Sequence, residues 1–312
     1  MRSPLSKRLR HEARPNVSLA LLTLALAAAA GSAQAGSFPA GGSHATVTIN
    51  DAAGYEWNLS MDSFVKYEAE TGLYSIDTSL LQTPVSDEDG RWSLGNVDLY
   101  DPETGTTTTV QGVSWHSWAT VNGTSGTASP GNPWRSSIVF ASTGNIDPYM
   151  SYGFVAKNNT NSVQTWTINY GEAIAPTING AYTLMADISG SVTNPNGTGS
   201  VIVTPTAANG KIQAIQLSGD GGTTYVNGGV DVGNGFSSNV VGSQPYGTDA
   251  AATTGSGIYD YWQFHAQFKL TPKDTLAATG YAEITPVPEP GTWALLVAGV
   301  GTLAFAVRRR RG

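Results

Sequence analysis

The sequence predicts an all-β protein: an antiparallel β-sandwich or jelly-roll-like body between an N-terminal signal helix and a single C-terminal transmembrane helix. Between Gly36 and Pro286 no long window has the 3.6-residue apolar period of a helix, whereas several stretches alternate apolar and polar residues. Glycine, threonine, serine and asparagine are abundant there, and leucine, lysine and glutamate are scarce. Asn-Gly pairs, which suit the type I′ turns of β-hairpins, begin at Asn122, Asn179, Asn196, Asn209, Asn227 and Asn234.

The first 35 residues have the parts of a secretory signal peptide in the right order. A basic stretch is followed by an apolar core from Val17 to Ala30, and Ala33-Gln34-Ala35 fits the A-x-A cleavage pattern. We therefore expect residues 1–35 to be removed after Sec-type export, with cleavage after Ala35. The alternative is a first membrane helix, for which the apolar run is short. The basic residues are Arg2, Lys7, Arg8, Arg10 and Arg14.

Residues 36–285 are expected to form the β body, with a possible sub-boundary near 130–133. The clearest alternation runs from Tyr261 to Leu270 and returns from Leu276 to Ile284 after a turn, which predicts a closing antiparallel hairpin. Asn209-Gly210 predicts a second hairpin between its neighbouring strands. Further predicted strands are Ala45–Asn50, Trp92–Tyr100, Ser136–Ser142, Ser151–Lys157, Val163–Tyr170, Ala181–Ser191, Ser200–Thr206 and Lys211–Leu217.

Charge and cysteine content exclude several classes of function. The chain has no cysteine, which rules out disulfides, thiolate metal sites and a cysteine nucleophile. Nine of the 16 basic residues lie in the two terminal segments; seven basic and 21 acidic residues remain in the body, a formal charge of about −14. Nucleic-acid binding needs a basic surface, so we expect no nucleic-acid partner.

Residues with catalytic chemistry are few. No metal-ligand spacing and no nucleophile elbow occurs, so we expect no metal, no cofactor and no catalytic residue. Ser114-Trp115-His116-Ser117-Trp118 is the one local cluster with catalytic residue types, and its alternation favours an aromatic strand. Acidic residues gather at Asp87-Glu88-Asp89 and at Asp98, Asp101 and Glu103; we expect solvated acidic turns there, with calcium binding left open.

Three tryptophans leave a binding function open. Trp115, Trp118 and Trp134 lie close together in sequence, and exposed aromatic rings on a sandwich can stack on sugars. Aromatic residues in β proteins belong more often to the core. A carbohydrate-binding module is therefore an alternative, and a secreted hydrolase, whose paired carboxylates sequence alone does not reveal, is a second one.

The last 27 residues have the properties of an extended peptide followed by a membrane helix. The prolines between Pro286 and Pro290 keep the backbone extended, because each fixes φ and restricts the preceding residue. The uncharged run from Thr292 to Val307 covers roughly 24 Å as a helix, somewhat less than a hydrocarbon core of roughly 30 Å. The basic residues that follow, Arg308, Arg309, Arg310 and Arg311, favour the cytoplasmic side and would place the body outside the inner membrane.

Residues 286–312 closely resemble the PEP-CTERM sorting signal of Gram-negative bacteria. The apolar helix and the basic end follow a motif made of Val287, Pro288, Glu289, Pro290, Gly291 and Thr292. The resemblance implies that an exosortase, a membrane transpeptidase, recognises and cleaves the tail at Pro-Glu-Pro. An ordinary membrane anchor is the alternative, although an anchor does not need that motif.

The resemblance implies a precursor anchored in the inner membrane and a mature form at the cell surface or outside the cell. We expect an exported, non-enzymatic protein of the cell envelope or extracellular matrix. The resemblance also implies exosortase as a processing partner and a link to exopolysaccharide.

Overall fold

A computed structural model describes most of the chain between residues 44 and 287. The chain divides into two units, Met1–Ser37 and Phe38–Gly312, and all described residues lie in the second. The predicted signal helix and transmembrane helix lie outside the described residues. The gaps within the described part are 53–55, 82, 87–89, 103, 118–134, 147, 196, 198 and 208.

The described part is all-β and its strand pairs are antiparallel, as predicted. Two short 3-10 turns, Asp62–Phe64 and Thr78–Leu81, are its helical elements. No helix among the described residues is long and apolar enough to cross a membrane. The strands are β1 (His44–Asp51), β2 (Glu56–Ser60), β3 (Val65–Glu68), β4 (Leu73–Ile76), β5 (Val85–Ser86), β6 (Gly90–Asp101), β7 (Thr106–Ser117), β8 (Ser136–Asn145), β9 (Tyr149–Asn158), β10 (Gln164–Asn194), β11 (Val201–Pro205), β12 (Gln213–Ser218), β13 (Val226–Val232), β14 (Phe236–Ser238), β15 (Gly242–Leu270) and β16 (Thr275–Pro286).

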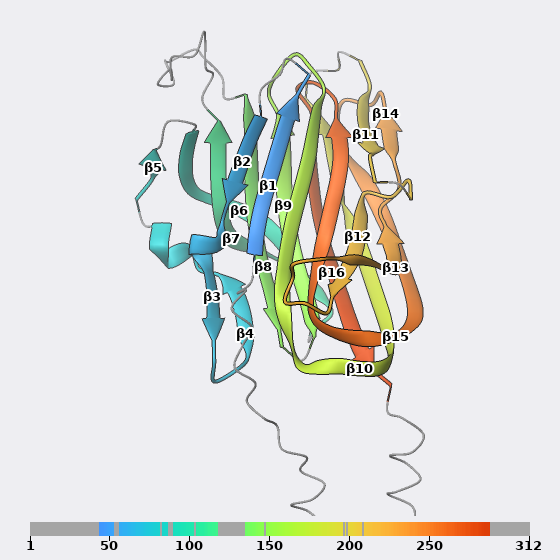
Figure 1. The fold of residues 1–312 in the computed structure, drawn as a ribbon. Helices are drawn as coiled ribbons and strands as arrows, with labels where there is room; N and C mark the ends of the chain where they lie inside the picture. Colours follow the sequence, from blue (N-terminus) through green and yellow to red (C-terminus); the bar gives the residue numbers. More distant parts are fainter. Residues whose placement is uncertain are drawn as a thin grey trace, which may run out of the picture. The chain divides into compact units, whose positions relative to one another are not determined.

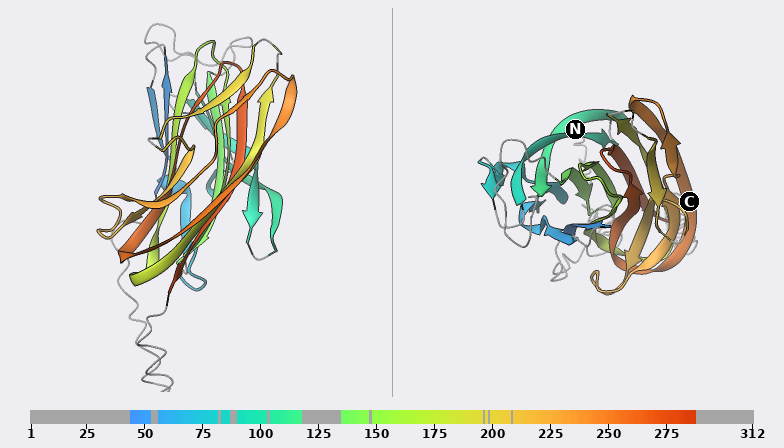
Figure 2. Two further views of the ribbon diagram at one scale, coloured as in Figure 1. Left: turned by 90° about the vertical axis from the view of Figure 1, so that its right-hand side faces the viewer. Right: turned by 90° about the horizontal axis from the view of Figure 1, so that it is seen from above.

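Two very long strands, β10 and β15, pair with each other and pass through two layers (Figure 1). The first part of β10, through Gly171, has β1 as its other neighbour, whereas the part from Tyr182 onward has β16 on that side. The register between β10 and β15 shifts between Ala173 and Ile178, where β10 passes from one layer to the other. Figure 2 shows the curvature of these strands from two further directions.

Two layers result from this arrangement. The first contains β2, β1, the start of β10, the end of β15, β12 and β13, with β11 and β14 beside it. The second contains the start of β15, the end of β10, β16, β9, β8, β7, β6 and β5, and the β3–β4 pair joins it at β8. The sandwich-like architecture expected from the sequence is therefore present.

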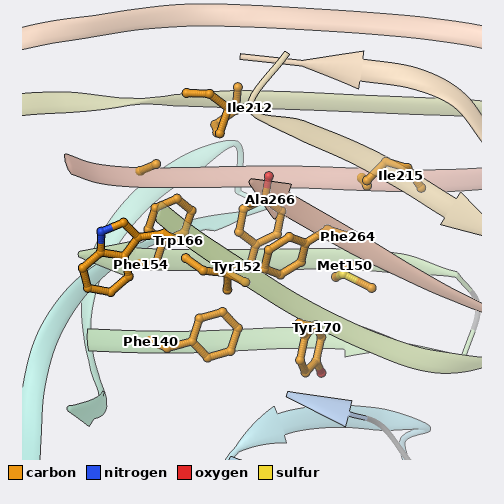
Figure 3. Packing of buried hydrophobic residues seen from close by; sticks show 14 of the residues in the cluster. Phe140, Met150, Tyr152, Phe154, Trp166, Tyr170, Ile212, Ile215, Phe264 and Ala266 are labelled. Carbon is orange, nitrogen blue, oxygen red and sulfur yellow. The ribbon is translucent and has the colours of Figure 1, made fainter. Parts of the chain in front are cut away.

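Aromatic rings from both layers interlock to form the core between them (Figure 3). Phe264 of β15 stacks on Tyr152 of β9 with ring centroids 3.9 Å apart, and Phe140 of β8 lies 6.2 Å away. Phe268 stacks on Phe154 of β9 in the same way. These side chains are fully buried, and each ring removes a large apolar area from water.

The predicted hairpin between Tyr261–Leu270 and Leu276–Ile284 is wrong. Both stretches are strands, but β15 and β16 do not pair with each other; each pairs with β10. The turn between them carries the chain from the first layer to the second instead of returning it beside its own strand. Lys273, with φ of 68°, forms the left-handed position of this turn.

The second predicted hairpin is also wrong, although its turn is real. Gly210 has φ of 73° and donates its backbone N–H to the Ala207 carbonyl. The strands on either side, β11 and β12, lie one after the other along the same edge of β15, so they do not face each other. The remaining predicted strands are confirmed, except that Val163–Tyr170 and Ala181–Ser191 are two parts of the single strand β10.

Buried Asn158 at the end of β9 holds the crossing turn in place. Its side-chain amide donates to the carbonyls of Leu270 and Thr271, at 3.0 and 3.2 Å. Its side-chain oxygen accepts from the backbone N–H and hydroxyl of Thr160. Every polar atom of this side chain is therefore bonded, which a buried amide requires.

We predict that Phe264→Ala lowers the free energy of unfolding by about 3–5 kcal/mol, because the cavity it leaves lies between the two layers. Urea unfolding followed by tryptophan fluorescence measures the loss. Thr204→Ala, at an exposed position of β11, is the control and should change stability by less than about 0.5 kcal/mol. Equal effects of the two substitutions would contradict the assignment of Phe264 to the core.

Candidate functional site

The sorting motif begins where the second layer ends. Strand β16 ends at Pro286, and the backbone N–H of Val287 donates to the Ala181 carbonyl at 2.9 Å. The Val287 side chain is 45% exposed. Pro288, Glu289, Pro290, Gly291, Thr292 and Arg308 to Arg311 lie outside the described residues, as do Ala33 and Ala35. The body's last strand is thus complete before the Pro-Glu-Pro element starts.

A groove of about 570 Å³ lies on the face of the second layer that points away from the core. Its floor is formed by β10, β16 and β9, one wall by β6 and β7, and the other wall by the start of β15. Neighbouring residues on the floor strands, such as Phe154 and Ala278, point the opposite way into the core. The floor and wall side chains include Asn96, Asp98, Thr107, Val155, Ser189, Ser191, Thr248, Ala277 and Thr279.

The wall formed by β6 and β7 lies directly over β9 because β9 has a glycine at the contact. A Cβ on Gly153 would lie 2.0 Å from the backbone oxygen of Asp98, closer than atoms can approach. The Ser151 hydroxyl donates to the Tyr100 carbonyl and fixes the hairpin at the same place. The groove is therefore part of the packed structure and does not depend on a loop.

The groove's polar chemistry is mostly that of neutral hydroxyl groups. Asp98 is its one charged lining residue, and its Oδ1 accepts a hydrogen bond from the Thr109 hydroxyl at 2.6 Å. Thr279 donates to the Tyr152 carbonyl at 3.2 Å. Such a surface can exchange hydrogen bonds with a neutral, hydroxyl-rich molecule.

A second, smaller hollow of about 300 Å³ lies beside the end of β16. Pro148, Tyr149, Tyr281 and Pro286 are among its lining residues, and the Tyr149 and Tyr281 rings are 6.2 Å apart. The Tyr281 hydroxyl donates to Glu283 at 2.9 Å. This hollow adjoins the point where the sorting motif leaves the sheet.

Trp115 lies in the core, which rules it out as a sugar-stacking residue, the alternative left open by the sequence. Its side chain is fully buried and packs against Trp57 and Trp92, with ring centroids 6.2 and 6.5 Å apart. It therefore offers no face for stacking on a sugar. Trp118 and Trp134 lie outside the described residues.

Ser114 and His116 lie side by side on β7, with Ser114 Oγ and His116 Nε2 3.1 Å apart. Burial, and next to it the charges of Arg91 and Lys157, hold the pKa of His116 below its ordinary value. Ser114 itself is buried. As the sequence favoured, the segment is an aromatic strand.

Within the described ranges no three His, Asp or Glu side chains converge as metal ligands would. Asp98 and Asp101 each accept a hydrogen bond from a nearby threonine, Thr109 and Thr104 respectively. The cluster at 87–89 and Glu103 are outside the described residues.

The buried carboxyl of Glu172 was not foreseen from the sequence. Glu172 lies on β10 opposite Trp262 of β15 and is completely buried. The Tyr170 hydroxyl is 3.4 Å from its Oε2. Burial raises the pKa of Glu172 well above its ordinary value of 4.5, and Trp262 and Tyr170 offset only part of this rise. An isolated glutamate in an alternating strand gives no signal in the sequence that it faces inward.

Comparison with known proteins identifies the tail. Residues 286–311 match the family model of the PEP-CTERM protein-sorting motif, which confirms the resemblance seen in the sequence. Such a motif implies export and a membrane-anchored precursor processed by an exosortase. No curated protein matches the chain.

Two solved structures show slight likeness. One is the enzymatically active domain of tailspike protein 4 from bacteriophage CBA120, with 11% identity, a TM-score of 0.22 and coverage of 46% of this chain. This chain spans only 19% of the tailspike chain. The other is the VP2 subviral particle of infectious bursal disease virus, with 10% identity, a TM-score of 0.18, and coverage of 86% of this chain and 85% of that one. TM-scores this low support no statement about fold or function.

We predict that the contribution of Glu172 to the stability of the folded protein falls as the pH rises above about 4.5, the ordinary pKa of a glutamate. Between that value and the raised pKa in the folded state, the folded protein keeps a proton that the unfolded chain has released, so each rise in pH favours unfolding. Glu172→Gln, which is neutral at every pH, should remove this part of the slope. Urea unfolding at pH values from about 5 to 9 measures it.

The matched control is Glu56→Gln on the exposed side of β2. That variant should retain the wild-type pH dependence. A Glu172→Gln protein whose stability falls with pH as steeply as the wild type would contradict the role assigned to the buried carboxyl.

Proposed function

We propose that this chain is an exported, non-enzymatic protein of the cell envelope or extracellular matrix, released from the inner membrane by exosortase cleavage at its Pro-Glu-Pro motif. The observation that carries the proposal is the position of the motif. The family match begins at residue 286, where β16 ends, and Val287 is exposed. A processing enzyme can therefore reach the motif without unfolding the sheet.

Cleavage at this place leaves the body intact. All 16 described strands lie before the motif, and β16 is hydrogen-bonded to β10 and β9 on its two sides. The removed segment contains Arg308 to Arg311 and the apolar run before them. The product is an acidic β domain without its hydrophobic tail, suited to the aqueous side of the envelope.

A non-enzymatic role agrees with the groups that the fold leaves accessible. Glu172 is enclosed in the core, and Ser114 is buried as well. The expected partners are the exosortase, the inner membrane during transit, and exopolysaccharide in the final location.

Carbohydrate binding is the second candidate, and the groove on the second layer favours it. Its volume of about 570 Å³ lies within the range of small-ligand sites, roughly 300–1,000 Å³. Its lining hydroxyls and single carboxylate suit a neutral saccharide held by hydrogen bonds. This differs from the tryptophan platform that the sequence left open as an alternative, because Trp115 is buried.

Sorting predicts a specific change in mass. The surface or released form from the native host should lack the residues that follow the Pro-Glu-Pro motif, because the exosortase cuts there. Intact-mass spectrometry of the mature protein measures the loss. If Arg308 to Arg311 are still attached in that form, exosortase cleavage is contradicted and the tail is an ordinary membrane anchor.

Replacing Glu289 with alanine tests whether the exosortase recognises this residue. The body should fold as in the wild type, because Glu289 lies beyond the last strand, while the protein stays in the inner membrane fraction. Unchanged release of this variant would refute the recognition role of Glu289.

For the groove, we predict that a neutral glycan retained by the wild-type body on a glycan array is lost by Ser189→Trp, whose larger side chain fills the groove floor. Thr204→Trp, at an exposed position outside the groove, is the control and should bind as the wild type does. Equal binding by both variants, or no binding by any form, would remove carbohydrate recognition in the groove from consideration.

A further inference from the structure

The second layer continues up to the residue that precedes the Pro-Glu-Pro motif. The backbone N–H of Val287 donates to the Ala181 carbonyl of β10, and Pro288 is the next residue in the chain. An extended chain spans at most roughly 3.6 Å per residue, so Pro290 reaches no farther than roughly 11 Å from Val287. An enzyme whose active site encloses the motif therefore comes very close to the end of β16.

The end of β16 is fixed to its neighbours on both sides. On the side of β9, the backbone N–H of Ile284 donates to the Pro148 carbonyl at 2.9 Å, and the Ile284 side chain is buried in the core. On the side of β10, Pro286 lies opposite Tyr182. Peeling the strand end away would break these hydrogen bonds, whereas contact with the folded end preserves them. The enzyme therefore meets a folded surface beside its substrate peptide.

That surface is the hollow of about 300 Å³ beside the end of β16. We call it the tyrosine hollow, and its lining includes Tyr149, Tyr281, Glu283, Pro148 and Pro286. The Tyr149 and Tyr281 rings are 6.2 Å apart, and the Glu283 carboxylate accepts a hydrogen bond from the Tyr281 hydroxyl at 2.9 Å. Tyr149 and Glu283 are half-buried, so both are partly open to a partner.

The prolines of the hollow determine what kind of partner fits. In an antiparallel pair, successive residues turn their N–H and C=O groups to opposite neighbours. Val287 bonds to β10, so Pro286 turns its backbone nitrogen and carbonyl to the other side, where the hollow lies. Proline has no N–H, and Pro148 lacks this donor as well, so an added strand finds few donors here.

Side chains of a folded partner fit the hollow better than a strand does. An apolar side chain can pack against the tyrosine rings, and a lysine or arginine can form a charge-assisted hydrogen bond with Glu283. The chemistry of the hollow thus calls for an apolar group beside a basic one on the partner's surface.

We propose that the tyrosine hollow is a docking site for the exosortase, which thus recognises the folded end of the body together with the Pro-Glu-Pro motif. This inference rests on the proposed function, because it presupposes cleavage at the motif. Position selects the partner. The motif is covalently joined to the rim of the hollow at Pro286, so an enzyme bound to the motif is held beside the hollow at a high effective concentration.

Docking at this place would make cleavage depend on a completed sheet. The hollow combines Tyr149 of β9 with residues of β16, and Tyr149 lies directly opposite Glu283 in the β9–β16 pair. Before β16 pairs with β9, the two parts of the hollow are separate. The exosortase would therefore cleave the folded protein faster than a precursor whose last strand has not docked.

The first test measures the rate of tail removal from the full-length precursor in its native host, by pulse-chase labelling. Tyr149→Ala should slow cleavage about tenfold, as expected when one well-packed aromatic contact is lost. Tyr149→Phe keeps the ring and should be cleaved at the wild-type rate. The control is Thr204→Ala on β11, at the other end of the body from the end of β16, which should not change the rate (Figure 1). Limited proteolysis shows that each variant is folded.

A second variant separates docking from a merely structural role of Tyr149. Inserting about six glycine and serine residues between Val287 and Pro288 adds up to roughly 20 Å of reach, so the motif no longer holds the enzyme beside the hollow. The insertion alone should slow cleavage, and Tyr149→Ala should then have little further effect, because the two changes remove the same contact.

Three results would overturn the docking site: cleavage of Tyr149→Ala at the wild-type rate, faster cleavage after the insertion, or an equal effect of Tyr149→Ala with and without the insertion. The first and second would show that the enzyme reads the motif alone, and the third that Tyr149 acts through folding. A wild-type protein that keeps its tail would instead refute the sorting proposal, and this inference with it. The wild-type rate thus distinguishes the two failures.

Discussion

The antiparallel ladder between β10 and β15 runs from Gln164 opposite Leu270 to Asn194 opposite Gly242, and it fixes the position of the other strands. Because β10 and β15 belong to both layers, the pairing of these two strands determines how the two layers are joined. Strands β1 and β16 pair with the same side of β10, β1 with its first part and β16 with its last part. The aromatic rings of the core pack together between the two layers that this pairing joins.

The same ladder explains where polar groups are buried. Glu172 lies close to the register shift after Ala173, where β10 leaves the first layer, and its side chain faces inward between the layers. A charged carboxylate there would lack solvent, so the neutral form is favoured. Asn158 is also buried, at the crossing turn, and there the cost of burying a polar side chain is offset because all of its amide atoms are hydrogen-bonded.

Local alternation in the sequence predicted the strands well and their partners poorly. The alternation from Tyr261 to Leu270 identified a half-buried strand, but a period of two does not say which strand lies beside it. Both predicted hairpins failed for this reason, since β15 and β16 flank β10 and β11 and β12 follow each other along β15. The sorting motif was recognisable because its information is local. The groove and Glu172 were not, because both depend on contacts between distant strands.

The central place of β16 has a consequence for the timing of folding. This strand lies between β10 and β9, yet it is the last part of the body to be synthesised and to cross the membrane. The second layer therefore stays open, with the sides of β10 and β9 that face β16 unpaired, until the chain has almost completely emerged. A tail that remains in the bilayer holds the protein at the membrane during this interval, so cutting after the final strand has docked releases a finished domain and not a partly folded one.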